Sequence, residues 1–103
     1  MIARAWRASA TAQGAEQYEV HFRGTVLPGL RALDGFRTAY LMRREVGGSV
    51  EIRVLTLWAS LDAIRAFAGA DLTTAVVEPA AEAVLTSYDI TVDLYEVIEH
   101  PAG

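Results

Sequence analysis

The sequence predicts one α+β domain over residues 1–103, with strands and helices in the order β-α-β-β-α-β. Apolar residues recur every three or four positions between residues 13 and 33, which is typical of an amphipathic helix. Gly47 and Gly48 separate two segments rich in branched and aromatic residues, which is typical of a β-hairpin. A chain of 103 residues can bury one core without crosslinks and is too short for a second domain.

Strands are expected over residues 2–9, 36–46 and 50–58, where the residue pattern favours an extended chain. In the third of these strands, apolar side chains occupy both faces: Val50, Ile52, Val54 and Trp58 on one, and Leu55 and Leu57 on the other. A sheet with one face in solvent alternates apolar and polar residues instead. Both faces of this strand are therefore expected to be covered.

The first helical segment is expected to be irregular near its middle. Pro28 has no N–H, and its ring collides with the carbonyl four residues earlier. We therefore expect a kink or break between Gly24 and Pro28. Asp34 and Gly35 then end the helix and turn the chain into the next strand.

The second half of the chain is predicted to hold a short helix, a fragmented helical stretch and a final strand. Ser60 is a good N-cap for the short helix, and Gly69 ends it. Further short helices are expected over residues 72–77 and 79–85, because both segments are apolar. The final strand covers residues 88–99 and again carries apolar side chains on both faces.

This order of elements is the ferredoxin-like, or split βαβ, arrangement, in which the helices cover one face of a four-stranded antiparallel sheet. The apolar side chains of the other face then need a second sheet to cover them. A second copy of the same sheet, related by a two-fold axis, supplies that cover most simply. The sequence therefore predicts a homodimer.

The composition excludes several classes of chemistry. All nine basic residues are Arg, the formal net charge is -4, and the chain has no Cys, Lys or Asn. Without Lys there is no Schiff base or P-loop, and without Cys there is no disulfide or zinc–thiolate site. No metal-ligand spacing is present, and an acidic chain without a basic cluster is not expected to bind nucleic acid. No segment approaches the ~20 apolar residues that cross a membrane, and the start lacks a signal-peptide pattern, so a cytoplasmic protein is expected.

Four segments carry a resemblance to a known family. They are Trp58–Gly69 (WASLDAIRAFAG), Ala75–Pro79 (AVVEP), Val92–Val97 (VDLYEV) and the corner Leu33–Phe36 (LDGF). Together they resemble the antibiotic biosynthesis monooxygenase (ABM) domain family over nearly the whole chain. The resemblance implies a dimeric α+β barrel, in which two ferredoxin-like subunits pack their sheets face to face. A shared fold does not by itself fix the reaction.

The family includes heme-degrading members and members that oxidise quinol-like polyketides with dioxygen and no cofactor. The heme-degrading relatives use an Asn, a Trp and an iron-binding His. Phe67 and Val77 stand at the Trp and His positions here, and the chain has no Asn. Heme degradation would therefore need His21 to replace the iron ligand, and we do not expect it.

The resemblance implies instead a cofactor-independent, monooxygenase-like protein that acts on a small hydrophobic aromatic or quinol substrate. The alternative is a non-catalytic small-molecule-binding or structural dimer of the same fold. The two differ in the space near the candidate residues, because an enzyme needs an open cavity with convergent polar groups.

His21 and Tyr40 are the candidate catalytic residues. Cofactor-free oxidation needs a base that deprotonates an acidic phenol or anthrone, and His21 lies beside the apolar stripe of the first helix. A solvated or structurally hydrogen-bonded His is the alternative. Tyr40 and Trp58 can stack on a flat aromatic ligand, although large aromatic residues on strands are usually part of a core.

Arg4, Trp6, Trp58 and Arg53 are the candidate substrate-binding residues. Arg4 and Trp6 share one strand face, so Arg4 can bind a carboxylate or phenolate while Trp6 lines the wall. Arg53 and Asp93 lie in mid-strand, where an unpaired charge that faces a core is costly. They either belong to a substrate site or form a salt bridge between subunits.

Overall fold

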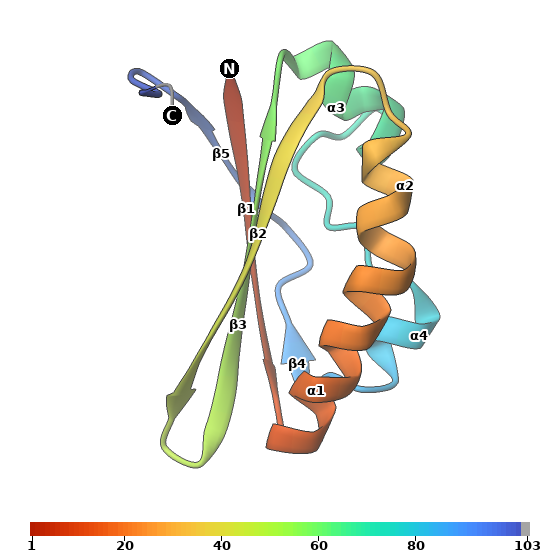
Figure 1. Cartoon of the computed structure of the whole chain (residues 1–103), viewed down its shortest axis with the longest axis vertical. Helices are drawn as coiled ribbons and strands as arrows, with labels where there is room; N and C mark the ends of the chain where they lie inside the picture. The colour runs from red at the N-terminus through yellow and green to blue at the C-terminus, as the bar shows by residue number, and fades with distance from the viewer. Residues whose placement is uncertain (102–103) are drawn as a thin grey trace.

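The computed structural model describes residues 1–101 and confirms the α+β class (Figure 1). The strands are β1 (Ile2–Ala10), β2 (Phe36–Val46), β3 (Ser49–Trp58), β4 (Ser87–Tyr88) and β5 (Asp93–Glu96). The helical segments are α1 (Ala12–His21), η1 (Phe22–Val26), α2 (Leu27–Arg31), α3 (Leu61–Ala68) and α4 (Pro79–Glu82). Figure 1 shows the helical segments on one face of the sheet, which we call the inner face; the opposite face is the outer face.

The sheet is antiparallel, with the strand order β2-β3-β1-β4. β4 and β5 both pair with β1, so these two short strands together fill the fourth position of the predicted sheet. β1 pairs with β3 along its whole length, from Ile2 opposite Trp58 to Ala10 opposite Val50. Because side chains alternate between faces, this register places Arg4 and Trp6 on the inner face.

The β2–β3 hairpin turns at the predicted glycines. Gly47 and Gly48 have φ angles of +55° and +84°, in the left-handed region that favours glycine. β2 has the predicted bounds, and β3 begins one residue before its predicted start.

Of the kink or break expected between Gly24 and Pro28, no break forms, because α1, η1 and α2 follow one another as a continuous helical rod; the helix is nevertheless irregular in this region. The irregularity is a π-helical turn, in which the Leu27 N–H donates to the Phe22 carbonyl five residues earlier. Pro28 cannot donate to Gly24 in any case, and the wider turn accommodates that missing bond without ending the helix. Among residues 1–101, no helix is both long and apolar enough to cross a membrane.

Gly35 forms the corner between α2 and β2. Its φ of +85° lies in the left-handed region. A Cβ atom at this position would lie 2.5 Å from the Cβ of Ala63 in α3. The Ala59 N–H also donates to the Gly35 carbonyl at 2.8 Å, so the corner is held against the start of α3. Only glycine fits this close approach without a shift of the backbone.

The caps of α3 are confirmed. The Ser60 Oγ accepts a hydrogen bond from the Ala63 N–H at 3.2 Å, and Gly69 follows the last turn with a φ of +82°. These caps satisfy backbone groups that a short helix would otherwise leave unpaired.

Two expectations for the second half of the chain are wrong. Residues 72–77 are not helical, and Thr74 forms an antiparallel bridge with Thr91. The strand expected over 88–99 is split into β4 and β5. The Asp89 N–H still donates to the Arg7 carbonyl of β1, but residues 90–92 pair with this non-helical segment instead. Backbone hydrogen bonds across that pair replace the helical bonds expected of this apolar segment, and α4 is shorter than the predicted 79–85.

Apolar side chains occupy both faces of the sheet, as predicted. On the outer face, Ala3 and Leu57 are buried, whereas Tyr40, Met42 and Tyr95 are between 46% and 57% exposed. This arrangement presents large apolar side chains to solvent around a close-packed centre.

Candidate functional site

A cavity of about 270 Å³ lies between the inner face of the sheet and the helices. β1 and β3 form its floor, the α1–η1–α2 rod and α3 form two of its walls, and residues 72–78, which we call the strap, contribute a third. Its volume is close to the lower end of the range for small-molecule sites, about 300–1,000 Å³. Most of the lining is apolar, and its polar members include Arg4, Trp6, Tyr18, His21, Thr56 and Glu78.

Arg4 places a buried cation on the cavity floor. It is only 6% exposed, and its guanidinium lies 5.4 Å from the centre of the Phe67 ring. Nε donates to the Leu72 carbonyl at 3.4 Å, and Nη2 donates to the Thr74 carbonyl. Burial lowers the pKa of Arg4 to about 10, so the side chain is still cationic at pH 7.

Within residues 1–101, no carboxylate forms a salt bridge with Arg4. An arginine has five N–H donors, and the contacts to the strap use two of them. The cation and its remaining donors can therefore serve an anionic oxygen in the cavity.

His21 contributes the one buried side-chain nitrogen or oxygen in the described chain that lacks a hydrogen-bond partner. Its side chain is 11% exposed and lies at the end of α1, where it lines the cavity. The nearest approach of its Nε2 to Glu78 Oε1 is 3.8 Å, which is too long for a hydrogen bond. The Nε2 atom is therefore free to accept a proton or a hydrogen bond from a ligand.

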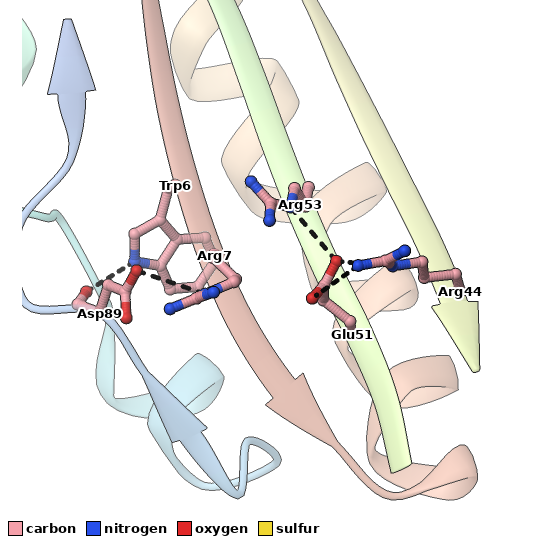
Figure 2. Close-up of polar contacts among 6 residues, drawn as sticks. All are labelled: Trp6, Arg7, Arg44, Glu51, Arg53 and Asp89. Carbon is pink, nitrogen blue, oxygen red and sulfur yellow. Dashed lines mark hydrogen bonds and ion pairs between the residues drawn. The ribbon is translucent and has the colours of Figure 1, made fainter. Parts of the chain in front are cut away.

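Trp6 and Tyr18 form one aromatic part of the cavity lining. Their ring centres are 6.0 Å apart, and the Trp6 Nε1–H donates to the Asp89 carbonyl at 2.8 Å (Figure 2). Burial and the charge of Glu78 raise the pKa of Tyr18 to about 12. Tyr18 is consequently a neutral phenol at physiological pH, and it cannot act as the base.

The other candidate residues do not line this cavity. Trp58 is fully buried behind Phe67, with 5.7 Å between the ring centres, and its Nε1–H donates to the Thr56 Oγ1 at 2.9 Å. Tyr40 projects from the outer face, where it is half-exposed. Arg53 also lies on the outer face.

Figure 2 shows the outer-face ion pairs of Arg53. Its Nε pairs with Glu51 Oε2 at 3.2 Å, and Arg44 pairs with the same carboxylate at 3.0 Å. The bonds from Arg44 and Arg53 hold the pKa of Glu51 below its usual range. The fold thus brings Arg4, Trp6 and His21 to one cavity, while a catalytic role for Tyr40 and a substrate-binding role for Arg53 stay predictions that need a ligand on the outer face.

Sequence reasoning missed three residues of the site. They are Tyr18, Phe67 and Glu78, none of which was among the candidate residues. Tyr18 precedes His21 by three positions, so helical spacing alone placed both on one face. Phe67 and Glu78 reach the cavity through the tertiary arrangement of α3 and the strap, which no local pattern indicates.

Phe67 and Val77 both line the cavity. These are the positions that the family resemblance aligns with the Trp and His of heme-degrading relatives. The cavity therefore has apolar side chains where those relatives are expected to carry their functional ones. Residues 1–101 contain no group of three or more His, Cys, Asp or Glu side chains placed to hold a metal ion.

No protein-family model matches this chain, and no curated protein shows significant similarity to it. Solved structures do share its fold. A protein provisionally named an antibiotic biosynthesis monooxygenase, from Deinococcus radiodurans, has a TM-score of 0.67 and 16% identity, covering 99% of this chain and 97% of that one. A protein with the same provisional name from Bacillus cereus has a TM-score of 0.65 and 15% identity, with the same coverage of 99% and 97%.

A protein of unknown function from Nitrosomonas europaea has a TM-score of 0.60 and 21% identity, covering 99% of this chain and 95% of that one. Each of these structural matches covers nearly the whole of this chain and of the matched chain. They show that this protein has the ferredoxin-like α+β fold found in structures that carry the antibiotic biosynthesis monooxygenase name. At such low identity they show the fold and not the reaction.

Proposed function

We propose that this protein is a cofactor-independent, monooxygenase-like enzyme that acts on a small hydrophobic aromatic or quinol substrate in the inner cavity. One observation carries the proposal: a mostly apolar cavity holds a cation without a carboxylate partner, Arg4, and a buried nitrogen without a hydrogen-bond partner, His21 Nε2. Both suit an acidic aromatic substrate.

In the proposed reaction, His21 Nε2 removes a proton from the substrate, and Arg4 stabilises the resulting anion. The electron-rich anion passes one electron to dioxygen. The two radicals then combine to form a C–O bond, and the O–O bond breaks as water leaves. For an anthrone, one molecule of dioxygen converts the CH₂ group to a carbonyl and yields one water, so atoms and electrons balance.

Oxygen uptake with a panel of anthrones and naphthoquinols tests this function. We expect His21→Ala to lower the rate by about 10²- to 10⁴-fold, the usual contribution of a general base. Tyr40→Phe is the matched comparison, because the half-exposed Tyr40 lies on the other face of the sheet. Equal rates in wild type and both variants would remove these residues from the mechanism. Ligand binding without oxygen uptake would favour the non-catalytic alternative.

We also propose that two copies assemble through their outer faces. The exposed side chains of Tyr40, Met42 and Tyr95 support this assembly, because burying them would remove apolar surface from water. Sedimentation at micromolar concentration should show a species of twice the 11.2 kDa chain mass. An 11.2 kDa species alone would contradict the homodimer.

A further inference from the structure

Proton uptake by His21 creates an electrostatic problem inside the cavity. Its imidazole is 89% removed from solvent, since the side chain is only 11% exposed. A buried imidazolium is unfavourable unless an anion or acceptor pairs with it. Arg4 lines the same cavity and already contributes one positive charge.

The Glu78 carboxylate lies where it can neutralise a protonated His21. Its Oε1 is 3.8 Å from His21 Nε2, so a shift of about 1 Å would bring the two atoms to hydrogen-bond distance. The Glu78 side chain is 49% exposed, so its carboxylate lies between the buried imidazole and solvent. Within residues 1–101, the other titratable groups that line the cavity with His21 and Glu78 are Tyr18, on the same helix as His21, and Arg4, on β1.

We propose that Glu78 is a positioning residue that pairs with protonated His21 and passes the substrate proton from Nε2 to solvent. This inference rests on the proposed function and extends it by naming the exit route of the proton. The charges then balance in two pairs: the substrate anion with Arg4, and the imidazolium with the Glu78 carboxylate. Neither pair leaves an isolated charge in the apolar cavity.

Glu78→Gln is the variant that tests this route. It keeps the shape of the side chain and removes its charge, and Glu78 makes no side-chain capping bond to α4 that the change would break. Glu82→Gln is the matched control, because it makes the same charge change on α4, where the carboxylate bonds the Tyr88 hydroxyl instead. Glu78→Asp is the conservative variant and should retain part of the effect.

We expect Glu78→Gln to lower kcat about tenfold with little change in KM, because the variant impairs proton removal and not substrate binding. Adding a small buffer base should restore the Glu78→Gln rate and leave the wild-type rate unchanged. Glu82→Gln should match wild type. A Glu78→Gln enzyme with the wild-type kcat at every buffer concentration would overturn the inference.

Nitrogen-15 NMR supplies a second readout that needs no turnover. At acidic pH, a hydrogen bond to Glu78 should slow exchange of the His21 Nε2–H and make its signal visible. We expect the signal in wild type and Glu82→Gln and its loss in Glu78→Gln, whereas the same spectrum in all three would contradict the pair. Oxygen uptake by wild type separates the two failures: a wild type that consumes no oxygen refutes the proposed function, and with it the proton route.

Discussion

Replacing Arg4 by Met should leave the fold nearly as stable and remove the anion site. The lowering of the Arg4 pKa from 12.5 to about 10 means that burial opposes the charged form by about 3 kcal/mol, at about 1.4 kcal/mol for each pH unit. Two hydrogen bonds from a charged donor return about 1.5–3 kcal/mol each. The burial penalty and these bonds therefore largely offset one another.

Methionine fills much of the same space and recovers about 1.5–3 kcal/mol of apolar burial. The carbonyls released by the change belong to Leu72 and Thr74 in the strap, where Thr74 is exposed and water can replace the lost donor. We therefore expect the free energy of unfolding to change by no more than about 2 kcal/mol. A ligand oxyanion would lose a charge-assisted bond, which corresponds to about 10- to 100-fold in affinity or kcat/KM.

Urea unfolding measures the stability, and quenching of Trp fluorescence by a phenolate ligand measures the affinity. Arg53→Met is the matched control, because it makes the same chemical change on the outer face, away from the cavity. A loss of more than about 4 kcal/mol in Arg4→Met would show that the cation mainly holds the strap. Unchanged ligand affinity in a folded Arg4→Met protein would remove Arg4 from the binding site.

Two further changes test the corner at Gly35 and the buried phenol of Tyr18. Gly35→Ala should destabilise the protein by about 3 kcal/mol in urea unfolding, because its backbone is left-handed and the new Cβ would clash with Ala63. Gly24→Ala is the control: a Cβ there meets nothing within 4 Å, so this change should be neutral or stabilising. The Tyr18 pKa of about 12 exceeds the ordinary tyrosine value of 10.0, so unfolding releases a proton between pH 10 and 12 and stability falls as the pH rises through that window. Tyr18→Phe should lack this fall in stability. The lowered pKa of Arg4 changes stability in the opposite direction in both proteins, so the difference between the urea midpoints of wild type and Tyr18→Phe isolates the contribution of Tyr18. Parallel midpoint curves against pH would refute the raised pKa of Tyr18.

Local signals predicted several turns and caps correctly. The Gly47–Gly48 turn, the Gly35 corner and the Ser60 cap each depend on a few neighbouring residues, and all three form as expected. The errors came where distant segments pair. The bridge between Thr74 and Thr91 draws one segment out of helix and another out of the sheet edge, and no local period encodes such a contact.

The sequence likewise predicted the positions of some candidate site residues better than those of others. Alternation along β1 was enough to put Arg4 and Trp6 on one face, and that face lines the cavity. The same alternation along β3 places Arg53 on the same face as Leu55 and on the other face from Val54. The outer-face position of Arg53 was therefore available from the sequence. The predicted two-residue turn at Gly47 and Gly48 fixes the register between β2 and β3 and sets Tyr40 opposite Leu55, so the face on which Tyr40 lies was also available from the sequence.

The contrast between two buried polar groups argues that the cavity serves a ligand. Trp58 is as buried as any residue of the protein, yet its Nε1–H is satisfied by the Thr56 hydroxyl, as expected for a polar group retained inside a core. His21 Nε2 is buried without such a partner, although a leucine at its position would suit the apolar wall. An unsatisfied nitrogen that weakens the fold is best explained by a partner that comes and goes, and the acidic substrate is that partner in the proposed reaction.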